Sequence, residues 1–273
     1  MGVTQDGGKP VTAQHLLVRY AKRGKMRFAS HLDVARAFER GVRRAGLPIA
    51  YSAGFTPHPK ISYAGGAPTG VASEAEYLSL TLTSWTEADA VRDRLNAALP
   101  DGIDVIAVAE DSGGLPMSRL TASEWQIALP GLPPDDVVPV VRKFLALTEA
   151  PVERLTSKGM RRMDARAAVV SLEVLGDAHS HLPGGGSGGP WSVPSGHLPV
   201  ARNTFAGDTP APPSPVPPAG SVLRMVVRHT VPSVRPDDVL NALRDVSDVF
   251  PAGQPLMTRL AQGSLGESGV VKL

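Results

Sequence analysis

The strongest constraint on the fold is an order of strand and helix patterns that occurs twice along the chain. In roughly the first 110 residues, runs typical of strands and amphipathic helices follow one another as strand, helix, strand, strand, helix, strand. The second half repeats this order from EWQIAL to PLMTRLAQ. Two copies predict an α+β fold of two tandem ferredoxin-like (βαββαβ) domains, each with an antiparallel sheet and both helices on one face.

The same patterns set the expected domain limits. We expect a disordered tail over 1–13, a basic domain over 14–112, a second domain over 119–265 and a tail over 266–273. Within the second domain, the 45 residues of 176–220 include 24 Gly, Pro and Ser and only three charged residues. Such a segment buries too little apolar surface to offset its ordering entropy, so we predict a disordered insertion at a hairpin turn.

The first helix has the clearest predicted boundaries. Ser30 is a typical N-cap, Asp33 is its capping-box partner, and Gly46 ends the helix. Just before this helix, the MRF segment is predicted to be extended. A second helix is predicted to begin with Thr86 as its cap, and the ARAAVVSLEVL run of the second domain is predicted to be a strand.

Positive charge is concentrated at the start of the chain. The first 60 residues hold eleven lysines and arginines against three acids, although the whole chain has a net charge of only +2. Arginine outnumbers lysine 21 to 7, and the guanidinium group suits bidentate contact with phosphate or carboxylate. Four arginines fall on the face of the first helix opposite its apolar residues: Arg36, Arg40, Arg43 and Arg44. We therefore expect this domain to face an anionic partner, the alternative being a merely solvated basic surface.

The segment 30–78 holds more chemically special side chains than folding alone requires. It contains His31, His58 and the carboxylates Glu74 and Glu76, which could exchange protons. Their spacing fits no metal-binding signature, so no metal site is predicted. The structural alternative is a helix-end hydrogen bond for His31 and a loop imidazole packed between prolines for His58.

Phosphate binding fits the same segment better. The loops GFTPHPK and AGGAPTG offer backbone N–H groups, and Lys60 ends the first of them. Tyr51 and Phe55 interleave with basic residues, a pairing typical of proteins that stack unpaired bases. No P-loop, nucleotide-binding glycine motif or hydrolase signature is recognisable.

A second group of cations lies in the turn TSKGMRRMDARA, where Asp164 is the single acid. It could extend the anion-binding surface of the first domain, although a solvated hairpin tip would look similar. The predicted polyanion-binding residues are Arg36, Arg40, Arg43, Arg44, Tyr51, Phe55, His58, Lys60, Lys158, Arg161 and Arg162.

The absence of cysteine excludes several kinds of chemistry. A chain without cysteine cannot hold an iron–sulfur cluster through thiolates, form a disulfide or use a thiol nucleophile. No apolar run approaches the ~18 residues of a membrane helix, and the first residues do not resemble a secretory signal. We therefore expect a cytoplasmic protein without membrane association.

Over 26–78 the sequence resembles a bacterial family of unknown function, the radical-SAM-linked (radical-SAM-associated) proteins. The shared elements are S-H-L-D at Ser30–Asp33, G-F-x-P-H-P-K at Gly54–Lys60 and S-E-A-E-Y at Ser73–Tyr77. A weaker K-G-x-x-x-x-D element follows at Lys158–Asp164. The resemblance implies an accessory role beside a radical S-adenosylmethionine (SAM) enzyme. The iron–sulfur cluster and S-adenosylmethionine are then expected on that partner only, with no cofactor bound by this chain.

These observations lead to one leading expectation and two alternatives. The leading one is an accessory or substrate-presenting partner of a radical SAM enzyme that binds RNA or another phosphate-bearing substrate through its basic domain. The first alternative is an RNA-processing enzyme in which His31 or His58 supplies acid/base chemistry and Lys60 stabilises charge. The second is a plain interaction module whose positive charge has no role in binding a phosphate-bearing substrate or in catalysis.

Overall fold

The structure is a computed structural model and describes residues 12–111, 117–156, 159–177, 220–250, 254–266 and 271–272. The predicted N-terminal tail and the predicted insertion over 176–220 lie almost wholly outside the described residues, as does Lys158. The strands that flank the insertion extend into its predicted limits, because one ends at Asp177 and the next begins at Gly220.

The strands and α-helices of the first half follow the predicted order, whereas the second half adds a two-stranded hairpin, a short helix and a terminal strand to it. In the first half they are β1 (Gln14–Lys22), the 3-10 helix η1 (Gly24–Phe28), α1 (His31–Arg44), β2 (Ile61–Tyr63), β3 (Ala72–Leu82), α2 (Ala88–Ala98) and β4 (Ile103–Glu110). In the second half they are η2 (Met117–Arg119), β5 (Ala122–Pro130), α3 (Pro134–Leu145), β6 (Pro151–Thr156), β7 (Gly159–Asp164), α4 (Ala165–Ala168), β8 (Val169–Asp177), β9 (Gly220–Arg228), α5 (Pro236–Val246), β10 (Leu256–Leu265) and β11 (Val271–Lys272).

Strands from both halves share one sheet. Its order is β4-β1-β3-β10-β5-β9-β8, with β2 beside β3 and β11 beside β10, while β6 and β7 form a separate hairpin. Neighbouring strands are antiparallel except β3 and β10, which are parallel and join the halves through two residue pairs, Ala72 with Thr258 and Ser73 with Arg259. The predicted α+β class with a mostly antiparallel sheet is thereby confirmed.

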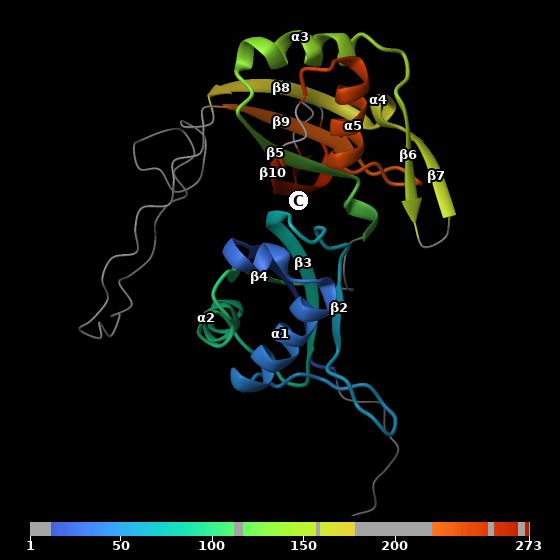
Figure 1. Ribbon diagram of the computed structural model, residues 1–273. Helices are drawn as coiled ribbons and strands as arrows, with labels where there is room; N and C mark the ends of the chain where they lie inside the picture. Colours follow the sequence, from blue (N-terminus) through green and yellow to red (C-terminus); the bar gives the residue numbers. More distant parts are fainter. Residues whose placement is uncertain are drawn as a thin grey trace, which may run out of the picture.

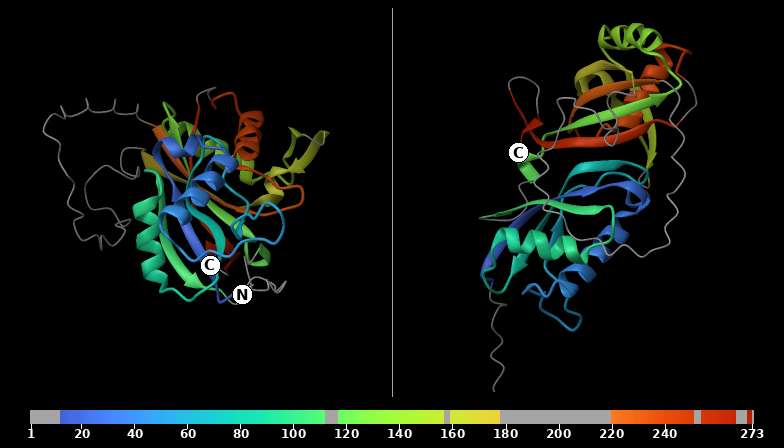
Figure 2. Two further views of the ribbon diagram at one scale, coloured as in Figure 1. Left: turned by 90° about the horizontal axis from the view of Figure 1, so that it is seen from below. Right: turned by 90° about the vertical axis from the view of Figure 1, so that its left-hand side faces the viewer.

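The strands of the two halves lie between two sets of helices (Figures 1 and 2). The first half places α1 and α2 on one outer side, and the second half places α3 and α5 on the other. One apolar core, which includes Phe38, Leu78 and Leu95, lies under α1 and α2. A second core, which includes Phe144 and Leu240, lies under α3 and α5.

The boundaries of α1 agree with the sequence. The hydroxyl of Ser30 accepts from the backbone N–H of Asp33 at 3.2 Å, and the carboxylate of Asp33 accepts from the backbone N–H of Ser30 at 3.1 Å. These two bonds are the predicted capping box. Gly46 follows the helix with a φ of +58°, a conformation that favours glycine.

Several local predictions are wrong. The MRF segment belongs to η1 instead of an extended piece, and Phe28 is exposed. The N-cap of α2 is Glu87 and not the predicted Thr86. The backbone N–H of Thr86 instead donates to the side chain of Gln14 at 2.9 Å. The first four residues of the predicted ARAAVVSLEVL strand form the short helix α4, which Asp164 caps. Residues 271–272, expected in a tail, pair with β10.

Candidate functional site

The exposed face of α1 carries the basic residues that the sequence singled out. Arg36, Arg40 and Arg43 are exposed and stand at positions i, i+4 and i+7, so they share one face of the helix. Among the described residues, none of these three side chains has an ion pair or hydrogen bond. Arg44 is different, because its Nη1 donates to the backbone carbonyl of Ala98 at 3.0 Å. The free cations of this face are therefore three rather than four.

Asp33 stands one turn before these arginines but serves the helix end. Its carboxylate accepts from both the hydroxyl and the backbone N–H of Ser30, at 2.6 and 3.1 Å. These hydrogen bonds lower the pKa of Asp33, and the charges of Arg36 and Arg40 lower it further. Asp33 is thus an ionised cap, not a free acid.

The loop between α1 and β2 presents one free aromatic ring. Backbone N–H of Ser52 donates to the carbonyl of His58 at 2.9 Å, which closes the loop, and Phe55 at its tip is fully exposed. His58 is exposed as well, and the loop projects from the first half in Figure 1. Tyr51 instead packs against the first core, and Lys60 is half-buried. Of the two aromatic residues predicted for stacking, only Phe55 presents a free ring.

His31 lies at a different place from His58. Its ring contacts Tyr63 edge to face, with 5.3 Å between centroids. A Cβ atom at Gly66 would lie 3.5 Å from both the Nδ1 of His31 and the Oε2 of Glu76. The structure therefore brings the Nδ1 of His31 and the Oε2 of Glu76 to the same side of Gly66, while His58 remains on its own loop.

Glu76 is part of a buried polar cluster between the halves. The Nη1 of Arg259 donates to the Oε1 of Glu76 at 3.2 Å, to the Oε1 of Gln262 at 3.1 Å and to the carbonyl of Gly65 at 3.3 Å. The other oxygen of Glu76 accepts from the backbone N–H of Ala67 at 3.0 Å. The side chains of Glu76 and Arg259 are only 3% and 7% exposed.

A second buried cation completes this cluster. The Nζ of Lys22 donates to the carbonyls of Ala67 and Pro68 at 3.1 and 3.2 Å. Burial lowers the pKa of Lys22, while Glu76 opposes that shift. We refer to Lys22, Glu76, Arg259 and Gln262 as the junction cluster. It fixes the glycine-rich loop before β3, which leads to Val71 in the core of the second half.

Sequence reasoning picked Glu76 from the junction cluster and missed its partners. Lys22 lies in the strand pattern of β1 and Arg259 in that of β10, at positions that the fold buries. A charged residue at an inward position of a strand was the available signal, but only the contact between β3 and β10 shows that the charges meet.

The remaining candidate acids have structural partners. Glu74 forms an ion pair with Arg23, which also contacts Asp104 at 3.1 Å, and this group is partly exposed. Burial tends to raise the pKa of Asp164, but three backbone N–H donors outweigh it and lower that pKa. Those donors are Ala150 at 2.9 Å, Arg166 at 2.9 Å and Ala167 at 3.2 Å.

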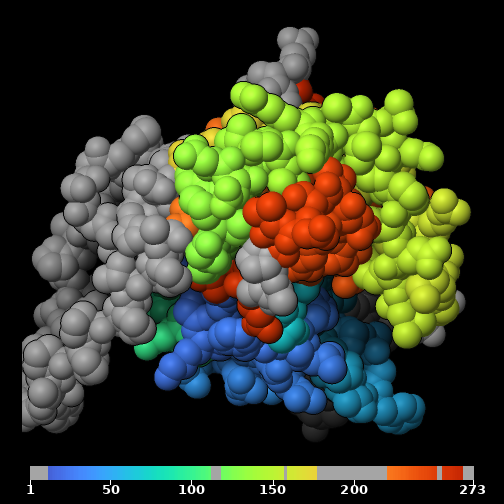
Figure 3. Space-filling view, turned by 45° about the horizontal axis from the view of Figure 1, so that its top comes forward, coloured from blue at the N-terminus to red at the C-terminus, as the bar shows by residue number. Residues whose placement is uncertain are grey.

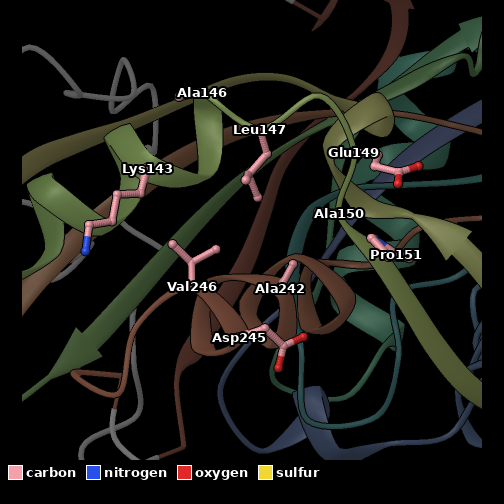
Figure 4. Close-up of a pocket in the computed structure, with 9 residues that line it drawn as sticks. All are labelled: Lys143, Ala146, Leu147, Glu149, Ala150, Pro151, Ala242, Asp245 and Val246. Carbon is pink, nitrogen blue, oxygen red and sulfur yellow. The ribbon is translucent and has the colours of Figure 1, made fainter.

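A pocket of about 660 Å³ opens between the ends of α3 and α5. Figure 4 shows Leu147 and Val246 extending toward its middle, and all of its lining residues belong to 143–151 and 242–246. It contains none of the residues that the sequence predicted for binding. Among the described residues, no group of three or more His, Cys, Asp or Glu is placed to hold a metal ion. In the same part of the chain, no helix is long and apolar enough to cross a membrane.

Comparison with known families matches residues 15–211 to a family described as uncharacterised proteins conserved in bacteria (DUF2344). The match covers more than half of the chain, so the chain belongs to this family. No curated protein matches the chain. The expected membership of a bacterial family of unknown function is thereby confirmed. The link to a radical SAM enzyme stays a prediction.

Proposed function

We propose that this member of an uncharacterised bacterial family is a non-catalytic partner of a radical SAM enzyme and that it binds RNA or another phosphate-bearing substrate through the exposed face of α1. The single observation that carries the binding half is the group of three exposed arginines, Arg36, Arg40 and Arg43. Like charges at helical spacing repel one another by about 0.2–0.5 kcal/mol per pair, and a bound anion would relieve this repulsion.

A phosphate-bearing ligand is a better partner for these three arginines than the carboxylates of the same chain. The acids nearest in sequence, Asp33 and Glu39, form no ion pair with these arginines among the described residues, and Asp33 is engaged by Ser30. A phosphate backbone offers repeated anionic groups that a row of guanidinium groups can contact. The exposed ring of Phe55 adds a surface for base stacking.

The binding half is tested with single-stranded RNA. For single strands, each phosphate contact adds about 0.7 to the slope of log affinity against log salt. We expect the double variant R36Q/R40Q to lower this slope by ~1.4, since it removes two contacts. The control R142Q/K143Q removes the same charge from exposed positions on α3 and should leave the slope unchanged. Equal slopes for both variants, or RNA binding that ignores salt, would refute an RNA site on α1.

The partner half rests on the resemblance at Ser30–Asp33, Gly54–Lys60 and Ser73–Tyr77. It is tested by purifying the tagged full chain from its native cells and identifying any radical SAM protein that is retained with it. A complex that survives RNase treatment supports a direct protein contact. No co-purification, with or without RNA, would remove this half of the proposal.

We extend the proposal to the fold and infer that each half is a ferredoxin-like unit. The strand orders β4-β1-β3-β2 and β10-β5-β9-β8 support this. When the separate hairpin β6–β7 is left out, the four strands of each half lie in the same order: fourth, first, third and second along the chain. Neighbours within each half are antiparallel. An experimental structure with another order in either half would refute it.

A second candidate function is RNA processing by His31. The observation that favours it is the position of this exposed histidine, whose Nδ1 lies on the same side of Gly66 as the Oε2 of Glu76. RNA cleavage by the purified chain that is lost in His31→Ala and kept in His58→Ala would support this candidate. Equal cleavage by both variants, or none by the parent chain, would dispose of it.

A further inference from the structure

The β6–β7 hairpin stands outside the main sheet and has two different faces (Figures 1 and 3). Its inner face is anchored: Val152 and Met163 belong to the core of the second half, and Arg154 pairs with the buried Asp238 of α5. Arg154 also donates to the carbonyl of Ser233 at 2.9 Å. An isolated two-stranded hairpin is marginally stable, so these anchors are what hold it in place.

The outer face of the hairpin exposes an apolar pair. Leu155 and Met160 are directly opposite each other across the two strands, and 75% and 61% of these residues is exposed. One step along the same face, Glu153 stands opposite Arg162. A cross-strand pair of this kind stabilises a hairpin by only about 0.2–1 kcal/mol, and the packing of this hairpin comes mainly from its inner face. A phosphate backbone does not explain the exposed apolar pair either.

The edge of β7 is the second feature of this hairpin. Among the described strands, β7 pairs only with β6, so its other edge offers backbone N–H and C=O groups to an added strand. Arg161 and Arg162 lie on this strand, are exposed, and form no ion pair or hydrogen bond with a described residue. Two adjacent cations on an edge repel a second copy of the same strand, so the edge selects against self-pairing and for an acidic strand.

From this register we infer that the β6–β7 hairpin is a docking site for an extended acidic segment of a protein partner, which adds to the edge of β7 as a third strand. An antiparallel strand would place two consecutive acidic residues opposite Arg162 and Arg161 and then an apolar residue opposite Met160. The apolar residue would complete the Leu155–Met160 pair, and the acids would lie one on each face because successive side chains alternate. This inference rests on the partner half of the proposed function and supplies its contact surface.

The test uses the full chain and two labelled peptides of known sequence. The acidic peptide is Thr-Val-Glu-Glu-Leu-Thr-Val-Thr, and its basic analogue carries Lys-Lys in place of Glu-Glu. We expect the acidic peptide to bind. The affinity of the basic analogue should be lower by at least about tenfold, because its lysines would lie opposite Arg161 and Arg162. Hydrogen exchange should slow at backbone amides of 159–164 on binding, which a side-chain contact alone would not produce.

Variants separate this site from the α1 face. The double variant R161E/R162E should lose the acidic peptide and gain the basic analogue, and L155S/M160S should weaken binding of either. The control L32S removes an apolar side chain of similar exposure, 65%, from α1 and should bind as the parent chain does.

Three results would overturn the inference: no binding of the acidic peptide, binding without slowed exchange over 159–164, or binding of single-stranded RNA that R161E/R162E abolishes. The last would assign the hairpin to the phosphate-bearing ligand instead. Peptide binding that is unchanged in R36Q/R40Q, while RNA binding is weakened, would support the docking site independently of the RNA site. RNA binding by the parent chain without any binding of the acidic peptide would remove the docking site and leave the RNA proposal intact.

Discussion

Replacing Glu76 by glutamine removes one charge from the junction cluster at almost constant shape. Two buried cations, Lys22 and Arg259, would then share a site with no carboxylate among their hydrogen-bond partners. Removing one partner of a buried ion pair typically costs about 3–5 kcal/mol, because the other charge is left uncompensated. The amide oxygen of glutamine can still accept from Arg259 or Ala67, so we expect the lower end, about 3 kcal/mol.

Glu74 supplies a matched control two residues earlier on β3. It also pairs with an arginine, Arg23, but the two side chains are 27% and 46% exposed. Water screens such a pair, so Glu74→Gln should cost about 0–1 kcal/mol. The comparison holds the residue type, the strand and the chemical change constant, and the main difference between the two sites is burial.

Urea unfolding at neutral pH, followed by circular dichroism, measures both free energies of unfolding. The double variant E76Q/R259M should be less destabilised than the two single variants added together, since it removes the unpaired guanidinium as well. If Glu76→Gln costs no more than Glu74→Gln, the junction cluster is hydrated and the reasoning from burial is refuted.

Two further predictions concern single residues of the second half. Nδ1 of His229 lies 2.7 Å from the carbonyl of Leu120, so it carries the proton, and Nε2 accepts from the hydroxyl of Ser123 at 2.7 Å. Burial lowers the pKa of His229 from its ordinary 6.5, the Leu120 hydrogen bond opposes this, and Arg259 lowers it further. As pH falls, the imidazole of His229 is therefore protonated in the unfolded chain before it is protonated in the folded chain. The free energy of unfolding should fall as pH drops below about 6.5, and it should fall less in His229→Gln. Equal pH slopes of the two proteins in urea unfolding would contradict this. Asp164→Ala should cost about 0.5–2 kcal/mol through loss of the α4 cap, whereas Asp164→Asn should retain most of that stability in thermal unfolding, and equal losses would show that capping is not the cause.

Local sequence patterns were sufficient where the stabilising groups are close along the chain. The capping box of Ser30 and Asp33 and the stop at Gly46 depend on residues within one or two helical turns of each other. The arginine face of α1 follows from helical periodicity alone. The order of strands and helices followed for the same reason, although the short helices η1 and α4 were missed because each contains only a single turn or so.

Contacts between distant residues were decided by the tertiary structure. The parallel pairing of β3 with β10 joins positions more than 180 residues apart, and no local pattern encodes it. That pairing buries Arg259 against Glu76. The sequence by itself determined which residues are charged and which face of a helix they share. The tertiary structure determined which of those charges are neutralised inside the protein and which remain for a ligand, because that depends on what each strand and helix packs against.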